Sequence, residues 1–211
     1  MHIRRAEASD SLSIAALHMR QIHWGLLSAL GEEFVTAFYR ALIRSSVGFG
    51  FVAEQDGRMA GFASGVVRWR RFYLEFLRRH PGLVTRTLVA AVGAARWRRL
   101  WQTTRYAASG ALPQAELVSI ALEPAARGAG VADALVRAVL AEFASRGVDA
   151  VRVTAGGTND AARRLYERVG FTLHAQTEIH PGEAAAIYVM SIDRGRLAAA
   201  GHVTVGTDGQ E

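Results

Sequence analysis

The chain has 211 residues, of which 50% are hydrophobic, and a formal net charge of +6 at pH 7. This length and apolar content are typical of one globular domain with a sizeable core and argue against intrinsic disorder. The sequence contains no cysteine, which excludes a disulfide framework, a thiolate zinc site and a cysteine nucleophile. It also contains no lysine, so a P-loop lysine and a lysine Schiff base are excluded as well. No apolar run reaches the ~20 residues that span a bilayer, and the first residues lack a signal-peptide core, so a cytoplasmic location is expected.

The predicted elements alternate between strands and helices in a mixed order. A short strand at 3–7 precedes a helix that begins at Asp10 or Ser11 and runs to about 24, and a second helix follows at 31–45. Two apolar runs flank Asp56 and Gly57, a dipeptide typical of a tight hairpin turn because both residues tolerate positive φ. The later elements are helices near 68–80 and 83–101, a strand at 116–122, a helix at 129–145, a strand at 148–155, a helix at 159–169, and strands at 171–179 and 184–192. This order predicts an α/β (α+β) fold with helices on both faces of a sheet.

A glycine-rich turn follows the predicted strand at 116–122. It leads directly into a helix, and its residues are Arg127, Gly128, Ala129, Gly130, Val131 and Ala132. Glycine lets the backbone approach a ligand, and the free N–H groups at a helix start favour an anion such as pyrophosphate. The turn does not match the dinucleotide-binding fingerprint, which requires Gly or Ala at its sixth position, because that position is Asp133 here. It does not match a P-loop either, because a P-loop requires a lysine. Glycine pairs are common at helix starts, so the turn alone leaves a purely structural role open.

Two spaced patterns point to one family. Residues 127–132 match Q/R-x-x-G-x-G/A, and residues 159–171 match N-x-x-A-x-x-L-Y-x-x-x-G-F, with one helix and one strand between them. In these patterns the chain resembles the GNAT superfamily of acyl-CoA-dependent N-acyltransferases. The resemblance implies a single GNAT-like domain over 1–192, with a mixed, mostly antiparallel sheet of about seven strands that splays between 116–122 and 148–155. A helical insertion at 68–105, between the third and fourth strands, and a Gly/Ala-rich tail at 193–211 depart from that pattern.

The resemblance also implies where a donor would bind. Acetyl-CoA would lie in the splay as a co-substrate, and no metal is expected. The strand residues Ile120, Ala121 and Leu122 would run along pantetheine, and the Ile120 N–H would polarise the thioester carbonyl. The turn at 127–132 would hold the pyrophosphate, while Asn159 would touch the pantetheine arm or a bound water. Tyr166 would protonate the departing thiolate, although a helix aromatic that only packs on the core is the alternative.

The acceptor chemistry requires a base. An alkylamine of pKa ~10 is only about one part in a thousand neutral at pH 7, which corresponds to roughly 4 kcal/mol. Some GNAT members place a base glutamate eleven residues before the Q/R position, and Glu116 stands eleven residues before Arg127. A carboxylate at an apolar cleft suits that task. An ordinary glutamate at the strand edge remains the alternative, and Glu123 is the second choice for the base. His18 and His23 of the first helix are expected to be surface or helix-packing residues, and Asp133 and Arg137 to form a surface pair four residues apart.

The arginine-rich insertion leaves the acceptor open. Residues 68–105 hold ten arginines against one acid, Glu75, with aromatic residues at helical spacing. Its apolar faces could pack on the core or in a homodimer, its arginines could select an anionic amine, or a helix could lie on an anionic membrane. No nucleic-acid motif accompanies the charge. The sequence therefore predicts an N-acetyltransferase that acts on a small-molecule or peptide amine, and the alternative is a non-catalytic acyl-CoA-binding module.

Overall fold

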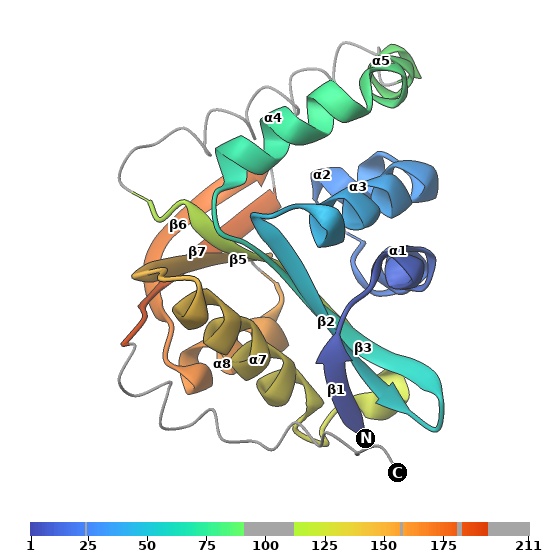
Figure 1. The fold of residues 1–211 in the computed structure, drawn as a ribbon. Helices are drawn as coiled ribbons and strands as arrows, with labels where there is room; N and C mark the ends of the chain where they lie inside the picture. The colour runs from blue at the N-terminus through green and yellow to red at the C-terminus, as the bar shows by residue number, and fades with distance from the viewer. Residues whose placement is uncertain (24, 91–111, 157, 181–182, 194–211) are drawn as a thin grey trace.

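The computed structural model describes residues 1–23, 25–90, 112–156, 158–180 and 183–193 (Figure 1). The predictions made for residues 91–105 and for the tail from residue 194 onward lie outside the described residues. The strands are β1 (His2–Arg5), β2 (Gly48–Gln55), β3 (Arg58–Val66), β4 (Ala115–Leu122), β5 (Ala150–Gly156), β6 (Thr172–His180) and β7 (Glu183–Ser191). The α-helices are α1 (Ser11–Gln21), α2 (Leu26–Ala29), α3 (Glu32–Arg44), α4 (Trp69–Arg79), α5 (Pro81–Ala90), α7 (Val131–Ser145) and α8 (Asp160–Val169). Two short 3-10 turns, η1 (Ala8–Asp10) and η2 (Pro124–Ala126), precede α1 and α7.

One seven-stranded sheet forms the centre of the molecule, as predicted. Its strand order is β1-β2-β3-β4-β5-β7-β6, and every neighbouring pair is antiparallel except β4 and β5. The hairpin turn between β2 and β3 falls at Asp56 and Gly57, whose φ angles are 52° and 71°. Both central residues thus have the positive φ that a tight hairpin turn requires, and the prediction is confirmed.

Helices cover both faces of the sheet (Figure 1). On one face, α1, α3 and α4 bury a cluster that includes Leu17, Phe38 and Phe72. On the other face, α7 buries Leu135, Val139 and Phe143 against the sheet, each fully inaccessible to solvent. The predicted inward face of this helix is therefore correct. A β-strand sends alternate side chains to opposite faces, and β2, β3 and β4 contribute to both clusters.

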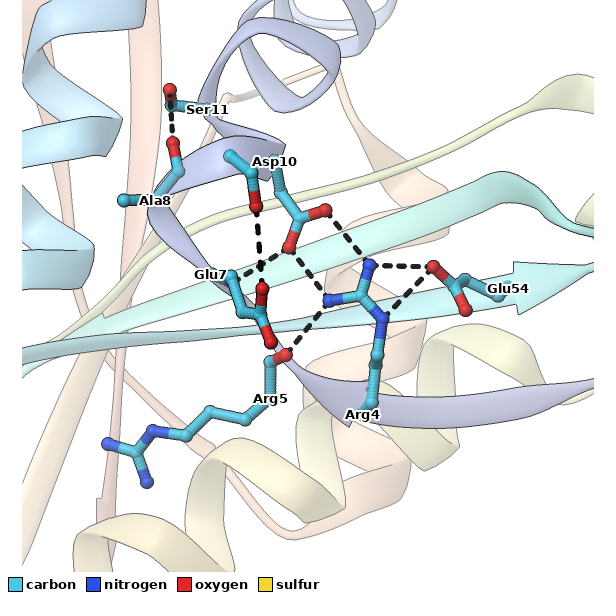
Figure 2. A network of polar contacts seen from close by, with 8 residues as sticks. Arg4, Arg5, Glu7, Ala8, Asp10, Ser11 and Glu54 are labelled. Carbon is cyan, nitrogen blue, oxygen red and sulfur yellow. Dashed lines mark hydrogen bonds and ion pairs between the residues drawn. The ribbon is translucent and has the colours of Figure 1, made fainter.

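Arg4 ties the first strand to its neighbours, as Figure 2 shows. Its guanidinium donates to both carboxylate oxygens of Asp10, at 2.8 and 2.9 Å, and to Oε1 of Glu54, at 2.6 and 3.0 Å. Asp10 Oδ2 also accepts the backbone N–H of Glu7 at 2.7 Å. Asp10 is the N-cap residue of α1, as the sequence predicted, but its side chain makes no capping hydrogen bond to that helix. It completes the capping box of the preceding turn η1 instead.

The described part of the insertion is helical, as expected, and amphipathic. Phe72 and Phe76 of α4 are buried against α3, whereas Arg70, Arg71 and Arg78 on the same helix are exposed. This favours the alternative in which the apolar face packs on the core and the arginines are solvated. Across the described residues, no helix is both long and apolar enough to cross a bilayer.

Candidate active site

The parallel strands β4 and β5 pair over only part of their length. The register joins Ala115 to Val151, Glu116 to Arg152, and Leu117 to Val153, and the pairing then stops although both strands continue. Backbone groups of β4 beyond Leu117 therefore face a gap where a neighbouring strand would otherwise satisfy them. The predicted splay is confirmed, and it offers hydrogen-bonding groups to an extended ligand.

A β-bulge lies where the two strands separate. On the other side of β4, Ser64 pairs with Ser119 and Gly65 pairs with Leu117, so Val118 is an extra residue in the ladder. A bulge bends its strand and disturbs the alternation of side chains. Accordingly, Leu117 packs in the α7 cluster, whereas Val118 packs on the α1–α3 cluster and Ser119 hydrogen-bonds Tyr39 of α3. Nothing in the sequence of this strand signals the bulge, since it contains neither glycine nor proline.

The glycine-rich turn forms the start of α7. Gly128 and Gly130 have φ angles of 82° and 76°, and a Cβ atom built on either would meet no atom within 4 Å. Glycine is needed there for its backbone conformation, and the space beside the turn is open. The first bond of the helix runs from Ala134 N–H to Gly130 O at 3.0 Å, so the N–H groups of Val131 and Ala132 lie ahead of any helical acceptor. The turn thus has the free donors, the positive helix dipole and the clearance that a pyrophosphate group needs.

Helix α8 contributes the second predicted pattern. Asn159 is its N-cap, and its Oδ1 accepts the N–H of Ala162 at 3.0 Å. This cap uses one of the two lone pairs of the oxygen, so the other lone pair and the amide NH2 group are available for the predicted ligand contact. Tyr166 is 4% exposed and packs between the rings of Phe171 and Tyr188 at centroid distances of 5.8 and 6.0 Å. Burial raises the pKa of the Tyr166 phenol well above its usual value.

Glu116 has a partner that the sequence did not suggest. Arg152 donates to Glu116 Oε2 through Nε at 3.0 Å and Nη2 at 2.8 Å, and the side chains of Arg152 and Glu116 are only 8% and 18% exposed. An arginine in the middle of a predicted buried strand is the one signal that could have pointed to such a pair, because a buried guanidinium requires a counter-charge. Glu116, the predicted base, is therefore ion-paired with Arg152 close to the point where β4 and β5 separate.

One cavity of about 1250 Å³ joins these features. This is larger than the roughly 300–1,000 Å³ of sites for drug-sized ligands and suits a long, two-part occupant. Of the residues predicted from the sequence, the following line it: Glu116, Ile120, Ala121, Leu122, Arg127, Gly128, Gly130, Val131, Ala132, Asn159 and Tyr166. Ala129 is the one predicted residue that does not. The residues that would bind the donor and the two candidate acid–base groups thus share a single space.

Three charged residues of the cavity wall, Arg127, Asp133 and Arg168, come from the glycine-rich turn, α7 and α8. Arg127 leaves the glycine-rich turn and donates to Gln21 Oε1 at 2.6 Å. Asp133 of α7 pairs with Arg168 of α8 at 2.9 Å through both of its oxygens, which holds the Asp133 pKa below its usual value. The sequence spacing predicted a pair between Asp133 and Arg137 on the same helix. That pairing is wrong because the neighbouring helix α8 presents Arg168 to both carboxylate oxygens.

The other end of the same cavity is apolar. Its wall is built by α2, α3 and α4 and includes Leu27, Leu30, Phe34, Trp69, Tyr73 and Leu77. The arginines of α4 and α5 do not line it in the described part of the chain, because they occupy the opposite face of an amphipathic helix. The expected role of these residues in attracting an anionic acceptor therefore has no support in the described insertion.

A buried chain of polar side chains is centred on His18, which lines the cavity. Tyr39 Oη lies 2.7 Å from His18 Nδ1, and Ser28 Oγ lies 3.1 Å from His18 Nε2. Ser28 Oγ donates its own hydrogen to the Ile22 carbonyl at 2.6 Å, so it can only accept from the imidazole, and the proton belongs on Nε2. Burial lowers the pKa of His18 to about 4, in keeping with a neutral ring. The sequence suggested a surface or packing role for His18, and packing is the role that the geometry supports.

Comparison with known proteins agrees with this geometry. The family described as Acetyltransferase (GNAT) family matches residues 16–171. The yncA protein of Salmonella typhimurium, solved with its cofactor acetyl-CoA, aligns with a TM-score of 0.60 at 19% identity, over 92% of this chain and 94% of that one. The ribosomal-protein-S18-alanine N-acetyltransferase of Escherichia coli aligns with a TM-score of 0.58 at 18% identity, over 100% of this chain and 99% of that one. At these identities the two structures show the shared fold.

A curated relative matches a shorter segment. The mycothiol acetyltransferase of Thermobispora bispora is 43% identical over 60 residues, which are 28% of this chain and 20% of the relative. This chain therefore spans about a fifth of the length of that relative. The family match covers most of the chain and contains both the glycine-rich turn and helix α8, which carries Tyr166. The chain belongs to the GNAT acetyltransferase family.

Proposed function

We propose that this enzyme transfers the acetyl group of acetyl-CoA directly to a primary amine, with Glu116 as general base and Tyr166 as general acid. One observation carries the proposal: a single cavity runs from the glycine-rich turn through the β4–β5 gap and is lined by both residues. A direct transfer requires donor, acceptor, base and acid in one space, because no covalent enzyme intermediate carries the acyl group between sites.

The donor would be held mainly by backbone groups. Acetyl-CoA supplies the acetyl group as a thioester. The N–H groups at 128–132 would receive its pyrophosphate at the start of α7, and the free edge of β4 beyond Leu117 would pair with its pantetheine amides. The N–H of Ile120 would polarise the thioester carbonyl as charge develops on its oxygen. Backbone donors of this kind are preorganised, so they need not reorient during the reaction.

Proton movements complete the step. The amine nitrogen attacks the carbonyl carbon, the C–N bond forms, the C–S bond breaks, and the nitrogen loses one proton. Glu116 would accept that proton directly or through a water molecule, since its Oε2 is oriented by Arg152 at the foot of the gap. Tyr166 would donate a proton to the departing sulfur, which gives the free thiol. Glu116 would then release its proton to solvent and the Tyr166 phenolate would take one from solvent, so both residues return to their starting forms. Because burial raises its pKa, the phenol stays protonated across the physiological range.

The test is amine-dependent release of free CoA. The purified chain should release thiol from acetyl-CoA with a suitable amine, and a chain without cysteine gives no background in thiol detection. The Tyr166→Phe variant should lose most of this rate. Full activity of that variant at every pH would remove Tyr166 from the proposal, and absence of any acyl transfer with a broad amine panel would overturn direct transfer to an amine.

A further inference from the structure

The apolar end of the cavity has a distinct composition. We call it the aromatic chamber and define it by Leu27, Leu30, Phe34, Trp69, Tyr73 and Leu77. These side chains are half-buried or exposed, and Phe38, Phe72 and Phe76 form the buried layer beneath them. The ring packing of that layer is dense, with Phe38 and Phe72 edge-on at 5.3 Å. The chamber is therefore a firm apolar surface that remains open toward the cavity.

Among the described residues, the chamber wall carries no carboxylate and no arginine. The charged residues that line the cavity in this part of the chain are Glu116, Arg127, Asp133, Arg152 and Arg168, which come from β4, β5, α8, the glycine-rich turn and the first turn of α7. Within the described residues, α2 to α5 contribute no carboxylate and no arginine to this wall. A polycationic acceptor would find no counter-ion there, and neither would an anionic one. Both would lose hydration without compensation.

The aromatic chamber is continuous with the β4–β5 gap, and this continuity limits which molecule can occupy the chamber. Both belong to the same cavity, and Glu116 and Ile120 line it together with Phe34 and Trp69. With the glycine-rich turn and the gap assigned to the donor, the chamber is the space left for the molecule that attacks the thioester. An apolar surrounding also disfavours the ammonium form of an amine and so assists the loss of its proton.

From these observations we propose that the acceptor is a primary amine that carries an aromatic or bulky apolar group. The apolar group fills the aromatic chamber while the amine reaches the gap beside Glu116. This inference rests on the proposed function, because it assumes that an amine attacks the donor there. The chemistry selects arylalkylamines over polyamines and over polar amino sugars, since the driving force is the burial of apolar surface.

A matched amine series tests the inference with the whole chain. The kcat/KM of thiol release from acetyl-CoA is measured with ethylamine, 2-phenylethylamine, spermidine and glucosamine. We expect 2-phenylethylamine to exceed ethylamine by roughly tenfold or more, since the two amines differ by one buried phenyl ring. A higher kcat/KM for spermidine or glucosamine than for 2-phenylethylamine would overturn the inference and leave the proposed transfer intact.

Two leucines on α4 provide a matched pair of variants. Leu77 lines the chamber, whereas Leu74 is 54% exposed on the same helix and does not. Leu77→Asp should lower kcat/KM for 2-phenylethylamine by about tenfold and reduce its advantage over ethylamine. Leu74→Asp should leave both values unchanged. If Leu77→Asp fails to fold, Tyr73→Asn, at a residue that lines the chamber and is 41% exposed, replaces it. Equal losses in the chamber variant and in Leu74→Asp would contradict the inference.

A binding measurement separates failure of the inference from failure of the proposed function. Calorimetry of 2-phenylethylamine with the CoA-saturated chain reports occupancy of the chamber without any turnover. Saturable binding that Leu77→Asp weakens supports the inference even if no acetyl transfer occurs, whereas turnover with other amines but no such binding overturns it. Tighter binding of octanoyl-CoA than of acetyl-CoA, with exclusion of 2-phenylethylamine, would assign the chamber to a longer acyl chain and overturn it too.

Discussion

Glu116 and Arg152 occupy the same rung of the parallel β4–β5 ladder, and their side chains form an ion pair with a shortest N–O distance of 2.8 Å. The next rung is the last before the strands separate. The pair therefore closes the inner end of the gap and orients the carboxylate that we propose as the base. Because both residues of this ion pair also line the cavity, a substitution at either one can change both the stability of the fold and the activity. Experiments must separate these two effects.

The first prediction concerns the stability of this pair. Replacing either residue with Gln leaves the other charge mostly buried, and each single variant should lose about 3 kcal/mol of unfolding free energy. The double variant should lose less than the sum, with a coupling of about 2 kcal/mol in urea unfolding. A coupling near zero would mean that the ion pair contributes nothing to stability.

The same variants distinguish a base from a structural glutamate. Glu116→Gln should lower kcat by about 100-fold or more, because the proton acceptor is lost. Arg152→Gln keeps the carboxylate and should lower kcat much less. Both are compared under conditions where the variants are folded, as judged by circular dichroism. Equal losses of kcat in the two variants would favour a purely structural role for Glu116.

The second prediction concerns Tyr166. Tyr166→Phe should lower kcat by about 100-fold, while the dissociation constant of acetyl-CoA stays nearly constant. Because burial raises the Tyr166 pKa, the phenol remains protonated beyond pH 10, and the wild-type rate should show no loss from its ionisation below that pH. The dependence of the wild-type kcat on pH between pH 6 and about 10 checks this expectation. An alkaline loss that is present in the wild type and absent in Tyr166→Phe would contradict it.

The third prediction tests the glycine-rich turn. Acetyl-CoA at a hundred times its dissociation constant should stabilise the folded chain by about 2.7 kcal/mol. Gly130→Glu should abolish this ligand-induced shift in melting temperature, since a carboxylate then occupies the proposed pyrophosphate position. Gly57→Glu is the matched control: its φ is 71° against 76° for Gly130, and both positions have open space around them. Both variants should lose intrinsic stability, but Gly57→Glu should keep the shift. A shift that survives in Gly130→Glu would mean that the turn is structural.

The fourth prediction concerns pH and His18. Burial lowers its folded pKa from 6.5 to about 4, so the unfolded chain binds a proton between these values that the folded chain does not. Stability from this group is present above about pH 6.5 and is lost as the pH falls toward about 4, by about 3 kcal/mol in total. His18→Gln removes the titration, so the stability difference between wild type and variant should shrink over that window. A constant difference from pH 7 to about 4 would show that His18 titrates normally.

Much of the fold could be predicted because its signals are local. The Asp56–Gly57 turn needs positive φ at two adjacent residues, and the amphipathic pattern of α7 places Leu135, Val139 and Phe143 on one side. Helix ends were less accurate: α1 ends at Gln21 rather than near residue 24. The residues after it form the separate turn α2 and supply part of the aromatic chamber, a role that no local pattern indicates.

Residues whose role depends on a distant partner were assigned less well. Asp133 was matched to Arg137 by helix spacing, yet it pairs with Arg168 from another helix. The ligand contact of Asn159 stays a prediction, and its oxygen also caps α8. For Asp133, helix spacing correctly identified a group that needs a partner, but the packing of α8 beside α7 supplied that partner.

By itself, the sequence determined the family, the donor chemistry and the order of the elements. Two short patterns carry that information, because a glycine-rich turn and a helix start are properties of adjacent residues. Only the tertiary structure decided the bulge at Val118, the counter-ion of Glu116 and the apolar end of the cavity. These depend on strand register and on helices brought together from distant parts of the chain. Burial and the need to pair charges select them only once the sheet has formed.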